Sequence, residues 1–175
     1  MRQGPRHVVL IGLMGSGTTT VGRLVAGALG VRLRDSDAEI EAREGRTVRE
    51  LDTAFGTDVM HRLEAEALLA ALADPGPSVV LAAASTIEDD RCVAALRGPS
   101  LVVAWLRISP AIAAARFASR GHRPWFGDDP ATFLAEQAAR RDPRFASVAT
   151  MTLDADDGPA ALLATRIVEA ARGSA

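Results

Sequence analysis

The chain has 175 residues, 48% of them hydrophobic, and a formal net charge of −2, with a single cysteine, Cys92. This length and composition predict one domain, residues 1–175, and the charge gives no reason to expect a nucleic acid or an anionic membrane as a partner. The lone cysteine excludes an internal disulfide and fits a reducing compartment, so we expect a cytoplasmic protein. We also expect a monomer or a weak homo-oligomer. No apolar run is long enough to cross a bilayer, and the short run after MRQGPRH predicts a core strand instead of a signal peptide.

A glycine-rich turn between a strand and a helix opens the chain. Residues 8–11, VVLI, are typical of a buried parallel strand, and apolar residues between 21 and 29 recur at helical spacing. In the turn, GLMGSGTT, glycines let backbone N–H groups point toward an anion, and the helix N-terminus adds its partial positive charge. We therefore predict a phosphate-binding loop rather than a purely structural turn. Its nucleotide-binding residues are Gly12, Gly15, Ser16, Gly17, Thr18 and Thr19.

One position departs from the Walker A pattern G-x-x-x-x-G-K-[ST]. Thr18 stands where lysine normally reaches the β- and γ-phosphates, while Thr19 keeps the hydroxyl that ligates magnesium. No other lysine can replace it, because all 20 basic residues are arginines. One explanation for the missing lysine is a GC-rich coding bias, which favours arginine and alanine over lysine. The other is a loop that is altered in its task or retired from it. Phosphate binding by the backbone should survive, whereas fast phosphoryl transfer is endangered.

Two carboxylates, Asp35 and Asp37, follow a short strand predicted at 31–33. Side chains two residues apart at the end of a strand face the same way, here toward the phosphate loop. One can hold Mg²⁺ through water, and the other can accept a proton from a substrate hydroxyl. The alternative is a helix N-cap followed by acidic residues in the first turn.

The remaining segments alternate between helical and strand patterns. Two short helices over 39–55 are hinged at 45–47, where Thr47 and Glu50 form a capping box. Further helices are predicted at 58–73, 89–96, 110–118, 131–141 and 159–171, and further strands at 78–81, 101–106 and 151–153. The helix over 131–141 is expected to end in the Arg140–Pro143 stretch. Strands that alternate with helices indicate a three-layer α/β fold with a parallel sheet of about five strands.

Residues 119–130, SRGHRPWFGDDP, break this alternation. They hold two glycines, two arginines, a histidine and two aromatic residues. Beside a phosphate-binding loop this composition predicts a lid that closes over a charged ligand, with a plain surface loop as the alternative.

Five stretches in order resemble the shikimate kinase family: GLMGSG, LRDSDAEIEAREGRTVREL, HRLEAEAL, RGHRP and RRDPRFASVA. The resemblance runs nearly end to end. It implies a P-loop NTPase fold with sheet order 2-3-1-4-5, substrate-binding helices at about 37–73, and a lid. It also implies a kinase that uses ATP and Mg²⁺ to phosphorylate a ring hydroxyl of a small carboxylated cyclohexene.

Four residues match functional positions of the family. By this resemblance Asp35 is associated with magnesium, and Asp37 contacts the reacting hydroxyl. Arg123 corresponds to the lid arginine near the transferring phosphate, and Arg116 to an arginine that lies along the adenine.

The substrate site matches only in part. Arg141 corresponds to one arginine of a pair that grips the substrate carboxylate, and His61 stands where the other would be. The family's Gly-Gly-Gly falls on Ala82–Ala84, so that Ala83 adds a methyl group where the substrate approaches the backbone. A histidine is mostly neutral near pH 7 and offers one donor in that direction, so we expect a narrower and less anion-selective pocket.

Three functions remain open from the sequence. The first is a small-molecule kinase that acts on shikimate or a related polyol or hydroxy acid. The second is a catalytically impaired nucleotide-binding relative, which the departures at Thr18, His61 and Ala82–Ala84 favour. The third is a small P-loop kinase for another acceptor, such as a nucleoside monophosphate.

Overall fold

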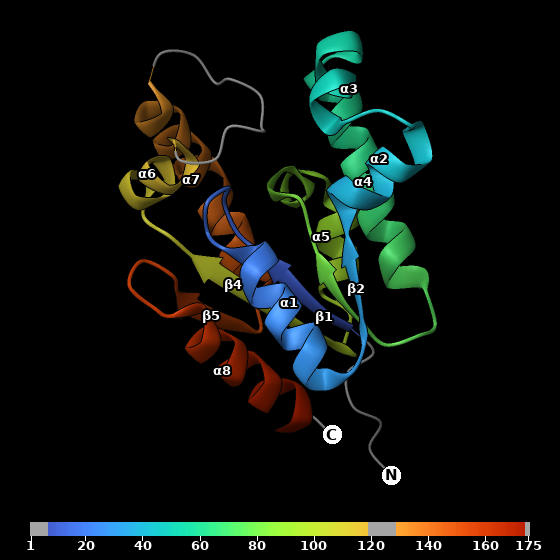
Figure 1. The fold of residues 1–175 in the computed structure, drawn as a ribbon, viewed down its shortest axis with the longest axis vertical. Helices are drawn as coiled ribbons and strands as arrows, with labels where there is room; N and C mark the ends of the chain where they lie inside the picture. The colour runs from blue at the N-terminus through green and yellow to red at the C-terminus, as the bar shows by residue number, and fades with distance from the viewer. Residues whose placement is uncertain (1–6, 119–128, 174–175) are drawn as a thin grey trace.

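The computed structural model describes residues 7–118 and 129–173, in which strands and helices alternate (Figure 1). The strands are β1 (His7–Ile11), β2 (Arg32–Asp35), β3 (Ser78–Leu81), β4 (Leu101–Arg107) and β5 (Met151–Asp154). The helices are α1 (Thr18–Leu29), α2 (Ser36–Glu44), α3 (Val48–Phe55), α4 (Thr57–Ala73), α5 (Asp90–Leu96), α6 (Pro110–Ala118), α7 (Pro130–Val148) and α8 (Ala160–Gly173), with a 3-10 helix η1 (Ala84–Glu88).

The five strands form one parallel sheet of order β2-β3-β1-β4-β5, which confirms the predicted fold and topology. Strand β1 lies in the middle, where Val9 pairs with Val80 on one side and Val103 on the other. Helices α1 and α8 lie together over one face, and α5 and α7 lie behind the other (Figure 1). Because β1 is covered on both faces, every residue in it is buried and its apolar run does not alternate.

Helices α2, α3 and α4 form a small hydrophobic cluster of their own beside the sheet. Its buried members are Ile40, Val48, Leu51, Met60 and Ala67. The predicted hinge is confirmed, because α2 ends at a left-handed Gly45 and α3 begins with the Thr47–Glu50 capping box. This cluster holds α3 and the start of α4 at the end of the sheet where the strands finish, and α4 then runs back along the sheet (Figure 1).

One predicted helix end is wrong. Helix α7 continues to Val148 with Pro143 inside it, whereas the sequence predicted a helix over 131–141. An interior proline costs about 3 kcal/mol, because it removes a backbone hydrogen bond and clashes with the preceding turn. Beyond the proline, Phe145 is 1% exposed and its ring centroid lies 5.9 Å from that of Trp105. Burying a large apolar side chain contributes roughly 1.5–3 kcal/mol, so this packing offsets the cost of the proline.

Two further expectations concern the cysteine and membrane-spanning segments. Cys92 on α5 is fully buried, and burial raises the pKa of its thiol to about 11, which fits a packing role. Within the ranges 7–118 and 129–173, no helix is both long and apolar enough to cross a membrane.

Candidate active site

The turn after β1 adopts a backbone conformation that glycine permits. Gly15 and Gly17 have φ angles of 84° and 89°. A Cβ on Gly15 would lie 2.9 Å from the carbonyl oxygen of Ala113, so α6 packs directly against the loop. Gly17 is the N-cap of α1, so no side chain accepts a hydrogen bond from the first N–H groups of the helix. The first turn also holds no acidic residue. The first N–H groups of α1 therefore suit an anion.

Ser16 is a second feature that fits a bound phosphate. Its side chain is buried. Among the described residues, its Oγ is the one buried side-chain nitrogen or oxygen atom that has no hydrogen-bond partner. A Cβ on Gly12 would lie 2.7 Å from this Oγ, so only glycine fits opposite it. A buried hydroxyl without a partner is costly unless a ligand satisfies it. The loop thus fits the phosphate groups of a nucleotide, with Thr18 and Thr19 in the adjoining turn of α1.

Arg116 on α6 connects the phosphate loop to the segment after β5. It donates to the carbonyl oxygen of Gly15 at 3.3 Å and to those of Ala155 and Asp156 at 2.9 Å each. These contacts hold the Arg116 guanidinium group against the phosphate loop. Its predicted contact with adenine stays a prediction.

Asp35 and Asp37 do not share a strand face as the sequence argument assumed, because α2 begins at Ser36. Asp35 is the N-cap of α2, and its Oδ1 accepts the backbone N–H of Asp37 at 3.1 Å. The alternative of a capped helix is therefore correct for Asp35, and Asp37 lies in the first turn. In the described part of the chain, no three acidic, histidine or cysteine side chains form a metal cluster. Mg²⁺ needs only one or two protein ligands beside phosphates and water, so a cluster of three is not required, and the predicted pair of Thr19 and Asp35 stays a prediction.

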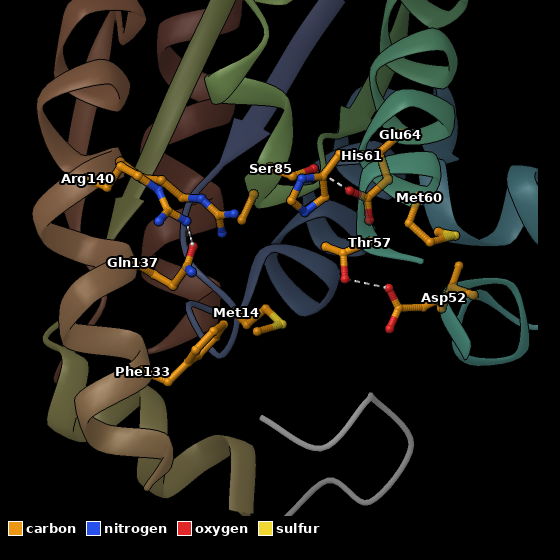
Figure 2. A pocket seen from close by; sticks show the side chains of 13 residues that line it. Met14, Asp52, Thr57, Met60, His61, Glu64, Ser85, Phe133, Gln137 and Arg140 are labelled. Carbon is orange, nitrogen blue, oxygen red and sulfur yellow. Dashed lines mark hydrogen bonds between the residues drawn. The ribbon is translucent and has the colours of Figure 1, made fainter. Parts of the chain in front are cut away.

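A pocket of about 280 Å³ lies between the phosphate loop, η1 and helices α3, α4 and α7 (Figure 2). Its lining residues are Met14, Val48, Asp52, Thr57, Met60, His61, Glu64, Ala84, Ser85, Phe133, Gln137, Arg140 and Arg141. The predicted substrate residues His61 and Arg141 thus come together from α4 and α7. Asp35, Asp37 and Ala83 are not among the described residues that line it, and Arg123 lies outside the described residues.

The α7 wall of the pocket carries two arginines with a shared counterion. Arg141 is 6% exposed, and its Nε donates to Oε1 of Glu88 at 2.5 Å. Arg140 donates to the same oxygen at 3.3 Å and to the amide oxygen of Gln137 at 3.0 Å. Burial would raise the pKa of Glu88, but Arg141 and Arg140 outweigh it and hold that pKa below its ordinary value. Glu88 is therefore ionised at neutral pH.

The wall formed by α3 and α4 presents a histidine and hydrogen-bonded carboxyl groups (Figure 2). Burial lowers the pKa of His61, and the positive charge of Arg141 lowers it further. His61 is therefore neutral at pH 7, as the sequence argument expected. The hydroxyl of Ser85 donates to Glu64, and that of Thr57 donates to Asp52 at 3.0 Å.

Ala83 has an ordinary backbone, with φ −61° and ψ 144°. Its carbonyl oxygen accepts the Thr86 hydroxyl at 2.7 Å and the Thr86 N–H at 3.1 Å. The turn into η1 therefore does not require a glycine. What the alanine adds is only the methyl group, at a half-buried position.

Sequence reasoning assigned no role to Glu64, Ser85 or Glu88. Glu64 could have been found, because it follows His61 by three residues and shares its helix face. Ser85 and Glu88 belong to a 3-10 helix whose direction no periodicity indicates. Their partners lie 21 and 53 residues away, so their contacts depend on the tertiary fold.

Comparisons with known proteins agree with this geometry. A family model for shikimate kinase matches residues 14–172. The shikimate kinase of Thermobifida fusca is 38% identical over 149 residues, 85% of each chain, and that of Moorella thermoacetica is 35% identical over 166 residues, 95% of this chain and 94% of that protein. The solved structure of shikimate kinase from Acinetobacter baumannii in complex with shikimate matches with a TM-score of 0.89 at 26% identity, over 98% of this chain and 95% of that one. The family model, the curated relatives and the solved structure thus agree over most of the sequence, and the chain belongs to the shikimate kinase family.

Proposed function

We propose that this chain is a kinase that uses Mg²⁺ and ATP to phosphorylate a hydroxyl of a small hydroxylated carboxylic acid, with shikimate as the reference acceptor. One observation carries the proposal: Met14 of the phosphate loop lines the same pocket as His61 and Arg141. An acid whose carboxylate contacts Arg141 would lie next to the loop that suits nucleotide phosphates. Such proximity of donor and acceptor is the main requirement of phosphoryl transfer.

In the proposed reaction ATP supplies the γ-phosphoryl group, and this chain orients both partners. The first-turn N–H groups of α1 bind phosphate oxygens, while Thr19 and Asp35 hold Mg²⁺. Asp37 accepts the proton of the acceptor hydroxyl. The hydroxyl oxygen bonds to the γ-phosphorus, and the bond between that phosphorus and the bridging oxygen of the leaving ADP breaks. Arg123, outside the described residues, is the proposed partner of the transferring phosphate.

Thr18 favours a second candidate, a nucleotide-binding relative with little or no turnover. A lysine at this position supplies positive charge to the β- and γ-phosphates, and a threonine at the start of α1 does not. The two candidates share nucleotide binding and differ in catalysis.

A two-stage experiment separates the candidates. First, Mg·ADP at millimolar concentration should raise the melting temperature, because a ligand of the native state stabilises it. Second, ADP release is followed with ATP, Mg²⁺ and a panel of shikimate, a neutral cyclitol and a nucleoside monophosphate. Turnover with shikimate supports the first candidate, and stabilisation without turnover on any acceptor supports the second. Turnover on the nucleotide alone would overturn both.

We also propose a single domain that acts in the cytoplasm as a monomer or a weak homo-oligomer. The buried, unpaired Cys92 supports a reducing compartment. Light scattering at micromolar concentration tests the oligomeric state, and a stable dimer or larger assembly would contradict it.

A further inference from the structure

Glu88 lies at the end of η1, directly behind the arginines of the α7 wall. Its Oε1 accepts hydrogen bonds from Nε of Arg141 at 2.5 Å and Nε of Arg140 at 3.3 Å. Its backbone carbonyl oxygen also accepts from Arg144 at 3.0 Å, which fixes η1 against α7. The Glu88 side chain is 28% exposed and that of Arg141 is 8% exposed, so this ion pair is partly shielded from solvent.

The atoms used in this contact matter for a ligand. Glu88 contacts Arg141 through Nε, on the side of the guanidinium group. This contact does not use the terminal Nη1 and Nη2 atoms, which can form a fork for a carboxylate, and among the residues that the structure describes neither atom has another hydrogen bond. The bond orients the guanidinium and at the same time places a negative charge next to it.

The charge balance of the pocket changes accordingly. Arg140 and Arg141 are the arginines in its described lining, and Glu88 compensates one of the two charges. The opposite wall adds no cation, because burial and Arg141 keep His61 neutral, and it also carries the carboxyl groups of Asp52 and Glu64. An acidic acceptor thus gains less from Coulomb attraction here than it would beside two arginines without a counterion.

We propose that Glu88 is a specificity-determining residue that orients Arg141 and offsets its charge, so that the pocket binds neutral hydroxylated acceptors nearly as well as acidic ones. This proposal rests on the proposed function, because it requires an acceptor in this pocket. It widens the substrate class to small polyols with or without a carboxylate.

The test compares two ligands that differ in one charge. Shikimate and its methyl ester are titrated by calorimetry into the wild type, Glu88→Gln and Glu66→Gln, each with Mg·ADP. The glutamine at 88 can still accept the Arg141 Nε–H, so it removes the charge and keeps the orientation. Glu66 is an exposed residue of α4 outside the pocket lining and controls for net charge.

Glu88→Gln should tighten shikimate binding about two- to fivefold, the upper part of the range for an ion pair that is partly exposed, and leave the affinity for the ester unchanged. Glu66→Gln should change neither affinity. The pKa of His61, followed by NMR, should fall further in Glu88→Gln, because the negative charge of Glu88 raises it while burial and Arg141 lower it. Asp52 and Asp58, which also raise this pKa, are unchanged in both variants.

Equal weakening of both ligands by Glu88→Gln would show a purely structural role and overturn the proposal. Unchanged shikimate affinity, or no shikimate binding by Glu88→Gln at all, would also overturn it. The proposed function is judged separately by turnover. Wild-type turnover with shikimate and no effect of Glu88→Gln would keep that function and refute this inference.

Discussion

Replacing His61 with arginine tests whether the acceptor carboxylate binds between α4 and α7. In the wild type, burial first and Arg141 second lower the pKa of His61. The carboxylates of Glu88, Asp58 and Asp52 oppose this shift without reversing it. At pH 8 the ring is therefore neutral, and Arg141 alone provides a charge-assisted hydrogen bond from this pair.

The magnitude follows from the bond that is restored. A hydrogen bond to a charged group contributes roughly 1.5–3 kcal/mol. Repulsion between the new guanidinium and that of Arg141 offsets part of this gain. We therefore expect His61→Arg to tighten shikimate binding at pH 8 about tenfold, which corresponds to ~1.4 kcal/mol.

The pH dependence has a defined sign. A bound carboxylate favours protonated His61, so binding takes up protons and the wild-type affinity should rise as the pH falls from 8 to 6. His61→Arg should flatten this dependence, because arginine stays charged throughout. His61→Gln is the matched neutral control, with wild-type affinity at pH 8 and no pH response. Calorimetric titration with Mg·ADP gives both quantities, and unchanged affinity of His61→Arg at pH 8 would refute the placement of the carboxylate.

Three other variants test other parts of the argument. Thr18→Lys should raise the rate of ADP release, since one preorganised charge at the reacting group is typically worth roughly 10²–10³-fold; a slower variant would mean that the loop functions better with threonine. Asp37→Asn should abolish turnover while the melting-temperature shift with Mg·ADP persists, because an amide cannot take a proton; activity within a few-fold of wild type would leave Asp37 a structural residue. Pro143→Ala should stabilise the protein by about 1–3 kcal/mol in denaturant unfolding, because it restores a helical donor; destabilisation would show that the bend at this proline is needed for packing.

The fold was predictable because local signals and burial pattern agree along most of the chain. The Thr47–Glu50 capping box, the apolar run of β1 and the glycine-rich turn each specify one local structure. The strand order came from the resemblance to a family, since alternation alone does not order a parallel sheet. The end of α7 was not predictable, because the rule that proline ends a helix was outweighed here by the burial of Phe145. Whether a side chain is buried depends on the tertiary fold, which the local sequence does not show.

The site was less predictable than the fold. His61 and Arg141 were identified by family position, and the structure brings both to one pocket. The sequence does not show which carboxylate a guanidinium will contact. Glu88 lies 53 residues before Arg141, and only the packing of η1 against α7 joins them.

Two positive charges expected from the family resemblance are absent, one at Thr18 in the phosphate loop and one at His61 in the pocket. They lie on different helices, α1 and α4, and no hydrogen bond or ion pair recorded among the described residues joins them. Thr18→Lys should therefore act on the rate and His61→Arg on acceptor affinity. Expressed as free energies from kcat/KM, the effects of the two single variants should add in the double variant to within about 0.5 kcal/mol. Addition would mean that two independent ends of one site have each lost attraction for an anion. Strong coupling would mean that the two positions act on the same part of the bound ligands and do not form independent ends of the site.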